Sequence, residues 1–350
     1  MKILIVGSVP TEQAPALSYQ RTFSALGHEV EIVDNSLFYK QAFWNRILNK
    51  FVRIPIYFGV KRLNDAILSR AKIFKPEMIL FLEQRQIKPE TLRAIKNLTG
   101  AVLFARNDDA VFRAKNLSTL FMKTLGVYDC IISMNSQNVT ELKRVGAKRA
   151  EFVPLAVDQA IEYPVEPANN EEKIRVGADV IFIGTYANED RVGYLERLCE
   201  EGCDIKIYGN GWRRAKGVRC LRGSGSIMYK PVIGEEMSKV INSSKIIIAF
   251  LRHHNRDQQT VRTYEIPACR GFMLHERTPE ATELFKEGVE AAFFSSYAEF
   301  RDKIKYYLVH DEERERIREA GYLRSKAQDY SYADRAEKIL KIYGEIKNKR

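Results

Sequence analysis

The stretch "DQQTVRTYEIPACRGFMLHE", residues 257–276, decides how this chain folds. Its middle part, 262–269, has the apolar spacing of a short helix with one buried face. Gly271 follows and is suited to end that helix, because glycine adopts the left-handed conformation of a helix C-terminus. The apolar "FML" after it is typical of a buried strand. A helix leading into a buried strand is one repeat of an α/β sheet.

Three polar residues stand at the start of this otherwise buried helix: Arg262, Thr263 and Glu265. A helix start offers free backbone N–H groups and a positive dipole end, both of which attract phosphate. An arginine there, with a carboxylate able to accept from a pair of sugar hydroxyls, would suit a nucleotide diphosphate and its ribose. The other interpretation is an Arg262–Glu265 ion pair one turn apart on an exposed face.

The rest of the chain repeats the same alternation of apolar strands and helices. Continuous apolar strands separated by helices predict parallel sheets covered on both faces, so the fold class is α/β with two doubly wound, Rossmann-like domains. Five strands are expected in the first half and five in the second: 2–7, 29–34, 77–82, 101–106 and 130–135, then 179–186, 203–212, 245–251, 271–276 and 291–296.

The polar, proline-containing segment 159–178 has no clear period and is interpreted as the link between the domains. We therefore expect an N-terminal domain over 1–160 and a C-terminal domain over 176–330. The charged helical tail, with 331–350 as its last helix, is expected to pack back on the first domain. The five cysteines are odd in number and lie in apolar runs, which favours reduced core thiols and a cytoplasmic protein.

Ligands of open α/β sheets bind at the carboxyl ends of the strands. Gly184 and Thr185 end one predicted strand, and Tyr208 and Gly209 end another. No three-glycine dinucleotide fingerprint, no phosphate-binding P-loop, no zinc-ligand spacing and no serine elbow occurs in the sequence. Metal or serine hydrolase chemistry is therefore poorly supported.

The segment "VRTYEIPACRGFML", with "YSYADRAEKIL" further on, resembles the C-terminal domain of group 1 glycosyltransferases, and most closely the CgeB-type, spore-maturation-like branch. Asp257 and Glu265 have seven residues between them and resemble the E-x7-E pair of retaining GT-B enzymes, with Asp at the first position. "VPLAVD", 153–158, resembles the segment that closes their N-terminal domain. The resemblance implies a GT-B fold, two Rossmann-like domains facing a central cleft.

The resemblance also implies roles for these residues. Glu265 would bind the ribose hydroxyls, and the catalytic candidate Asp257 would lie near the hydroxyls of the donor sugar. The diphosphate would be held by Arg262 and Thr263 beside the Gly184–Thr185 turn, with Tyr208 and Gly209 next to the base. GT-B enzymes need no metal and no other cofactor, since cationic side chains and a helix dipole stabilise the leaving diphosphate. The substrate would be a nucleotide diphosphate sugar.

The first domain should supply the acceptor side. Asp108 and Asp109 follow the strand 101–106 and are candidates for a general base or for orienting a hydroxyl. Helix capping by Asp109 is an equal alternative. Gly7 and Ser8 end the first strand and are expected to approach the donor sugar.

Residues 37–62 form a basic aromatic segment with seven aromatic residues, six Lys or Arg and no acid. A helix over about 41–53 would place Trp44 and Phe51 on an apolar face and Lys50 and Arg53 opposite, which suits an anionic membrane interface. A helix docked on the domain is the alternative. We expect a cell-surface glycan or lipid-linked acceptor and a peripheral position on the inner membrane face, with nucleic acid as the alternative acceptor and a non-catalytic sugar-nucleotide-binding protein as another reading.

Overall fold

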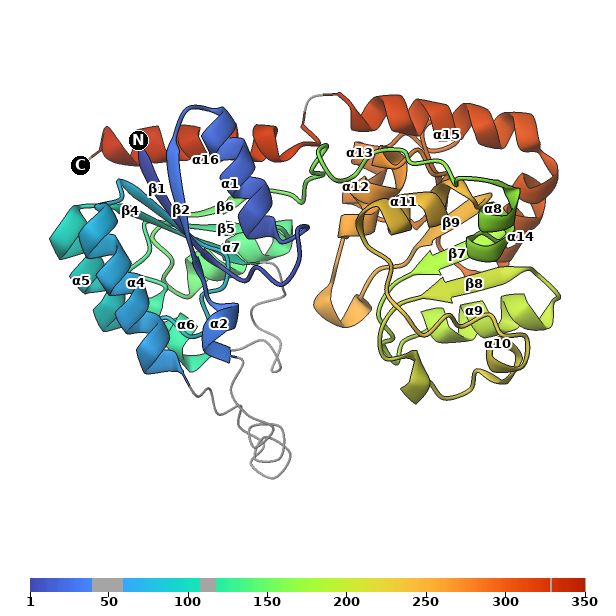
Figure 1. The fold of residues 1–350 in the computed structure, drawn as a ribbon, viewed down its shortest axis with the longest axis horizontal. Helices are drawn as coiled ribbons and strands as arrows, with labels where there is room; N and C mark the ends of the chain where they lie inside the picture. Colours follow the sequence, from blue (N-terminus) through green and yellow to red (C-terminus); the bar gives the residue numbers. More distant parts are fainter. Residues whose placement is uncertain (40–58, 108–117, 328, 350) are drawn as a thin grey trace. The chain divides into compact units, whose positions relative to one another are not determined.

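The computed structural model describes residues 1–39, 59–107, 118–327 and 329–349. The chain divides into two compact units, each with its own sheet. Unit 1 consists of Met1–Pro154 and Tyr332–Arg350, and unit 2 of Leu155–Ser331. The two parallel sheets covered by helices agree with the predicted α/β class (Figure 1).

Unit 1 holds a parallel sheet in the order β2-β1-β3-β4-β5-β6. Its strands are β1 (Lys2–Gly7), β2 (Glu29–Asp34), β3 (Met78–Phe81), β4 (Val102–Asn107), β5 (Cys130–Ser133) and β6 (Ala150–Phe152). Its helices are α1 (Pro15–Ala25), α2 (Ser36–Tyr39), α4 (Val60–Phe74), α5 (Pro89–Thr99), α6 (Thr119–Thr124), α7 (Ser136–Arg144) and α16 (Tyr332–Lys347).

Alternate side chains of β1 explain why helices cover both faces of this sheet. Successive residues of a strand point to opposite faces. Ile3 and Ile5 share a core cluster with α1 and with α16, whereas Leu4 and Val6 pack with α4 and α5. Figure 1 shows these two helix layers on opposite sides of the sheet. The last helix therefore belongs to the core of unit 1, although unit 2 precedes it in the chain.

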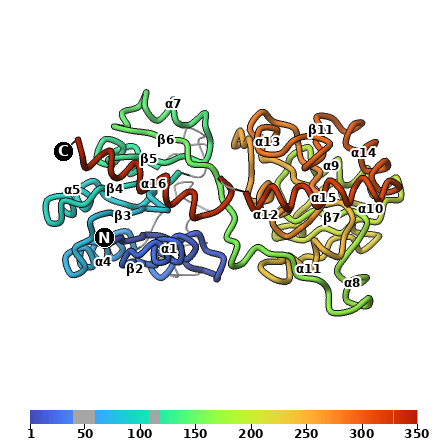
Figure 2. The backbone as a smooth tube through the Cα atoms, turned by 90° about the horizontal axis from the view of Figure 1, so that it is seen from above, coloured from blue at the N-terminus to red at the C-terminus, as the bar shows by residue number. Residues whose placement is uncertain are grey.

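Unit 2 holds a parallel sheet in the order β11-β10-β9-β7-β8. Its strands are β7 (Val180–Ile183), β8 (Ile205–Tyr208), β9 (Ile246–Ala249), β10 (Met273–Glu276) and β11 (Ala292–Phe294). Its helices are α8 (Asn170–Val176), α9 (Arg191–Glu200), η1 (Trp212–Arg214), α10 (Arg219–Gly223), α11 (Gly234–Asn242), η2 (His253–Asn255), α12 (Val261–Ala268), α13 (Pro279–Leu284), α14 (Tyr297–Val309) and α15 (Asp311–Ser325). In Figure 2, α15 runs above α12, and the two helices are in contact.

The segment expected to be a link between domains is instead part of unit 2. It contains α8, and it is attached to α11: Ser238 Oγ donates to the carbonyl of Tyr163 at 2.6 Å and accepts from the N–H of Val165 at 2.9 Å. Tyr163 also donates from its hydroxyl to Glu235 at 2.9 Å. The polar composition of this segment reflects hydrogen bonding to a helix surface, which a search for hydrophobic periodicity does not detect.

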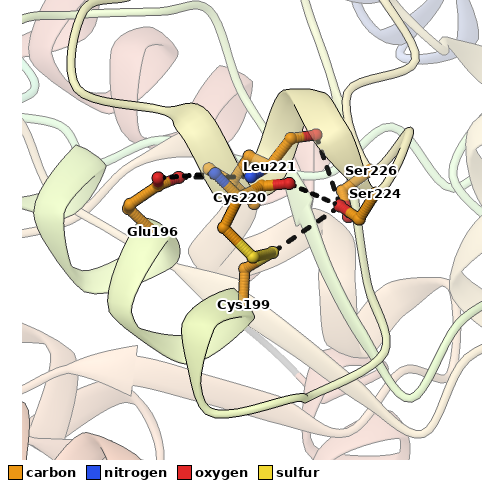
Figure 3. Close-up of a disulfide and its surroundings, with 6 residues drawn as sticks. All are labelled: Glu196, Cys199, Cys220, Leu221, Ser224 and Ser226. Carbon is orange, nitrogen blue, oxygen red and sulfur yellow. Dashed lines mark hydrogen bonds between the residues drawn. A yellow bond between two sulfur atoms is a disulfide. The ribbon is translucent and has the colours of Figure 1, made fainter.

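The prediction of five reduced thiols is wrong for one pair. Cys199 of α9 and Cys220 of α10 form a disulfide (Figure 3). Cys130, Cys203 and Cys269 are free, and burial raises the pKa of each of these thiols to about 12. None of the helices in the described ranges has the length and apolarity that a bilayer crossing requires.

Candidate functional site

The strand order of unit 2 places its candidate site between β7 and β9. After β7 the chain first adds β8 on one side and then crosses to add β9 on the other. Such a reversal point opens a crevice at the carboxyl ends of the strands, where ligands of α/β sheets bind. The loops that follow these strands carry Gly184 and Thr185 after β7, and residues 252–257 after β9. The stretch 257–276 therefore begins at the crevice between β7 and β9.

The ends of β7 and β8 approach each other so closely that Gly209 has no room for a side chain. A Cβ at Gly209 would lie 2.0 Å from the carbonyl oxygen of Gly184. The Gly184 N–H donates to the Tyr208 carbonyl at 2.8 Å, and the Trp212 indole donates to the Gly184 carbonyl at 2.9 Å. Gly184 and Gly209 thus serve the packing of this turn, whereas Thr185 is exposed beside it.

Arg262 connects the start of α12 to the end of β7. Its Nε donates to the carbonyl of Ile183 at 3.1 Å, and its Nη1 lies 3.1 Å from the Sδ of Met237. The same Nη1 donates to Oε2 of Glu265, an ion pair one turn apart. The alternative interpretation expected this pair on an exposed face, but the side chains are only 21% and 14% exposed. Arg262 and Glu265 are therefore brought together beside the β7 turn.

Thr263 does not lie where a phosphate could reach its side chain. It is 0% exposed. Its hydroxyl accepts the N–H of Thr260 at 2.9 Å and bonds to Nε2 of His275 at 2.8 Å. Since Nδ1 of His275 faces the carbonyl of Glu276, Nδ1 carries the proton and Nε2 accepts from Thr263. Burial lowers the pKa of His275 to about 4, so this ring is neutral. The predicted role of Thr263 in binding phosphate is corrected to one of capping α12.

The Tyr208 side chain is likewise removed from any ligand. It is 1% exposed, and its hydroxyl donates to the carbonyl of Val176 at 2.7 Å. The prediction that it flanks a base is therefore corrected, because the ring belongs to the core between β8 and α8. The sequence signal, an aromatic residue at a strand end, is common to core and ligand-binding residues and does not separate them.

A carboxyl group missed at the sequence level lies beside the Arg262–Glu265 pair. Glu162 is only 7% exposed, and its Oε2 accepts the N–H of Asp158. Burial, and next the negative charge of Glu265, raise the pKa of Glu162 to about 8. Below that pH the group is neutral. Glu162 lies in the segment 159–178, which has no hydrophobic periodicity, so no sequence pattern marked it as part of a site.

Asp257 lies in the loop after β9, with a side chain that is 14% exposed. Its carboxylate is 3.9 Å from Nε of Arg252. The buried Arg191, at the start of α9, donates to the carbonyl of Thr185 at 3.1 Å. Burial lowers the pKa of Arg191, and the negative charge of Asp257 is one of those that oppose this lowering. Asp257 and Thr185 are thus both close to Arg191, which sequence reasoning missed.

Two histidine–carboxylate pairs surround the same loop. His253 pairs through Nε2 with Glu276 at the end of β10, and His254 pairs through Nδ1 with Glu189 in the loop after β7. Glu276 also accepts the N–H of Leu251 at 2.9 Å. These contacts fix the β9 loop to both neighbouring strands. The adjacent histidines were visible in the sequence, but their carboxylate partners lie 23 and 65 residues away.

Of the site residues predicted in the first domain, the structure describes Gly7 and Ser8. Gly7 is the last residue of β1 and Ser8 follows it, where the order of the unit 1 sheet reverses between β1 and β3. A Cβ on Gly7 would lie 3.0 Å from Leu82 and 3.3 Å from Ala16, so its small size serves close packing. Asp108 and Asp109 lie outside the described residues. The same holds for most of the segment 37–62, including its predicted helix.

In the described part of the chain, no group of three or more His, Cys, Asp or Glu side chains is arranged to hold a metal ion. The site in unit 2 consists of two arginines, two carboxylate-paired histidines, and the carboxyl groups of Asp257, Glu265 and Glu162. Guanidinium groups recognise phosphate oxygens, and carboxylates accept from hydroxyls. Such a set is suited to a ligand that carries both.

Comparison with known proteins identifies the class. Residues 191–341 match the family described as glycosyl transferase-like. Together with two parallel α/β units and GT-B structural neighbours, this match shows that the chain is similar to glycosyltransferases of GT-B fold. The predicted resemblance, fold class and enzyme class are confirmed at this level.

Particular relatives extend the comparison. The chain is 19% identical over 267 residues to the spore protein CgeB of Bacillus subtilis (strain 168), covering 73% of this chain and 79% of CgeB. The structure resembles sucrose-phosphate synthase from Thermosynechococcus elongatus, with a TM-score of 0.69, 11% identity and full coverage of both chains.

Two further structures resemble the chain at similar levels. HepE from Anabaena, in complex with UDP and glucose, has a TM-score of 0.66 and 11% identity, covering 99% of this chain and 100% of its own. An alpha-glucosyltransferase in complex with UDP-glucose and DNA has a TM-score of 0.64 and 12% identity, covering 98% and 99%. At these identities the structural likeness establishes the fold.

Proposed function

We propose that the protein transfers a glycosyl group from a nucleotide diphosphate sugar to an acceptor hydroxyl, with unit 2 binding the donor. The observation that carries this proposal is the attachment of Arg262 to the end of β7, with Glu265 as its partner. This places a guanidinium and a carboxylate at the reversal point of the sheet, where a diphosphate and a ribose would lie side by side. Solved structures of the same fold hold UDP or UDP-glucose.

The proposed chemistry needs no metal. The bond between the anomeric carbon and the phosphate oxygen breaks, the acceptor oxygen forms a new bond to that carbon, and the acceptor hydroxyl loses its proton. Negative charge develops on the leaving diphosphate, and preorganised cations stabilise it. Arg262 and Arg191 are the cations that lie beside the β7 turn. We also propose a retaining outcome, which rests on the spacing of Asp257 and Glu265; NMR assignment of the product anomer tests it.

Calorimetric titration with UDP, GDP, dTDP and ADP tests donor binding. Glu265→Ala should weaken the binding of the preferred nucleotide by roughly 1–3 kcal/mol, the cost of removing hydrogen bonds to a charged group. Glu319→Ala is the matched control, because Glu319 pairs with Arg270 at 2.7 Å on an exposed part of the same unit. Unchanged affinity in Glu265→Ala, or an equal loss in the control, would remove Glu265 from the site.

Glu265→Gln is a second variant that keeps the size of the side chain next to Arg262. It tests whether a loss of affinity in Glu265→Ala comes from the missing carboxylate or from loss of folding. A second measurement separates an enzyme from a sugar-nucleotide sensor. With the preferred nucleotide sugar, an enzyme releases the nucleoside diphosphate by transfer or slow hydrolysis, whereas a sensor binds it unchanged. Binding without any release under all acceptor conditions would contradict the proposed transfer.

For the acceptor, we propose a cell-surface glycan precursor or lipid-linked glycan at an anionic membrane. The support is the sequence of residues 37–62, whose pattern predicts a helix with Trp44 and Phe51 on an apolar face and cations opposite. Replacing Lys50, Arg53, Lys61 and Arg62 by Glu should strongly weaken co-sedimentation with anionic vesicles. The likeness to a glucosyltransferase bound to DNA makes nucleic acid the second candidate. A wild-type protein that ignores vesicles and shifts duplex DNA at physiological salt would favour that candidate.

A further inference from the structure

The stretch from the end of β8 to the start of α11 is basic without interruption. Residues 209–234 contain six Lys or Arg and no Asp or Glu: Arg213, Arg214, Lys216, Arg219, Arg222 and Lys230. We call these six residues the α10 patch. β8 is the outermost strand of its sheet, and α10, which follows it, packs against α9 rather than at the reversal point between β7 and β9. The cations on α10 and in the loop before it therefore require an explanation other than the donor site.

Most cations of the α10 patch have no acidic partner. Across the described residues, only Lys230 of the six forms an ion pair, with Glu236 at 2.5 Å. Arg214, Lys216 and Arg219 are exposed. Elsewhere in unit 2, exposed cations such as Lys305 and Arg316 pair with nearby glutamates. Like charges gathered without counter-charges repel one another, and an anionic partner relieves that repulsion.

The backbone that carries the patch is fixed in place. The disulfide between Cys199 and Cys220 joins α10 to α9, and Figure 3 shows it beside the other contacts of this turn. The buried carboxylate of Glu196 accepts the N–H of Cys220 at 2.7 Å and that of Leu221 at 3.2 Å. Arg222 donates to the carbonyl of Ala215 at 2.6 Å, which closes the loop before α10. The cations are thus displayed on a rigid support.

Apolar side chains accompany these cations. Tyr229 is exposed, and the guanidinium of Arg213 lies over its ring, 4.9 Å from the centroid. Ile233 is also exposed, 48% of its surface, just before α11. A nucleic acid backbone requires only neutralising cations. The boundary between headgroups and acyl chains accommodates exposed tyrosine and isoleucine side chains in a basic segment of this kind.

We propose that the α10 patch binds the anionic headgroups of a membrane surface, with Tyr229 and Ile233 entering the interface. The patch would hold the donor-binding unit itself at the membrane. It adds to the proposed membrane-linked acceptor but uses residues of unit 2 only, and it does not depend on the segment 37–62. The membrane test of the patch can therefore fail while donor binding and transfer are confirmed. Donor binding or transfer can equally fail while the patch still binds membranes.

The test is co-sedimentation of the full-length protein with phosphatidylcholine vesicles, with and without phosphatidylglycerol. Each cation close to an anionic bilayer strengthens binding roughly fivefold. The triple variant Arg214→Gln, Lys216→Gln, Arg219→Gln should thus bind anionic vesicles about two orders of magnitude more weakly. The matched control Arg175→Gln, Lys286→Gln, Arg316→Gln removes three exposed cations of the same unit from outside the patch, and it should bind like the wild type.

Further outcomes separate the alternatives. A second variant, Tyr229→Ser with Ile233→Ser, should weaken vesicle binding while all six cations remain. Nucleotide affinity by calorimetry should be unchanged in both patch variants, which shows that they fold and that the donor site is separate. Wild-type binding of vesicles by the triple variant, or an equal loss in the control, overturns the proposal. Patch-dependent shifts of duplex DNA without vesicle binding overturn it in favour of nucleic acid.

Discussion

The buried carboxyl of Glu162 gives the sharpest quantitative expectation. Its pKa is raised from 4.5 to about 8 by burial and by the charge of Glu265. Between those two values the folded state keeps a proton that the unfolded chain has lost. The free energy of unfolding therefore falls as pH rises through this window and levels off above pH 8. At 1.36 kcal/mol for each pKa unit, a rise of this size corresponds to a penalty of roughly 5 kcal/mol.

Glu162→Gln should remove this penalty. The amide keeps an oxygen that can accept the N–H of Asp158, and it carries no charge at any pH. Near pH 5 the variant and the wild type should unfold within about 0.5 kcal/mol of each other. Near pH 9 the variant should be more stable by up to roughly 5 kcal/mol. Water that enters the site would solvate the carboxylate and make this difference smaller.

Urea unfolding followed by tryptophan fluorescence measures this difference, because the buried Trp212 reports on unit 2. Glu166→Gln is the control, since Glu166 is an exposed glutamate of the same segment, and it should show no gain at high pH. Glu162→Gln in a Glu265→Gln background should gain less, because one cause of the raised pKa is gone. Parallel stability curves for wild type and Glu162→Gln from pH 5 to pH 9 would refute the reasoning.

Two further expectations concern the support of the site. Gly209→Ala should lower the free energy of unfolding by at least about 2 kcal/mol, measured by urea unfolding, because its Cβ would meet the Gly184 carbonyl at 2.0 Å; wild-type stability would contradict this close approach. Cys199→Ser should lower it by about 3 kcal/mol, the chain-entropy value for a bridge between residues 21 apart. Mass spectrometry of unreduced wild-type protein that finds only free thiols would rule the bridge out.

Local sequence patterns were sufficient for the α/β class and for every strand except the three-residue β6. Strands such as β1, β7 and β9 are continuous apolar runs, and a run of that kind has few places in a protein other than a sheet buried on both faces. A break in the helical tail was likewise predicted around 329–335. Tertiary packing decides which domain the last helix joins, because its Ala336, Ile339 and Ile342 pack with β1.

The site was predictable only in part, for reasons that differ between residues. Arg262 and Glu265 are close in sequence, so helix geometry alone places them together. Thr263 lies on the same helix, but its hydroxyl is hydrogen-bonded to the buried His275 of β10. Glu162 and Arg191 enter from distant segments and carry no local signal. A sequence pattern identifies neighbours along a helix, and it is silent about partners that the fold brings in from elsewhere.

The charge of Glu162 also bears on donor binding. Below its pKa the cluster of Arg262, Glu265 and Glu162 has one positive and one negative charge; above it, a second negative charge appears. A diphosphate is repelled by that added charge. Wild-type affinity for the preferred nucleotide sugar should thus fall several-fold between pH 7 and pH 9, a range in which the charge of the diphosphate is constant. Calorimetry on Glu162→Gln should give a flatter profile. An equal fall in both proteins would assign the pH dependence to another group and place Glu162 outside the reach of the diphosphate.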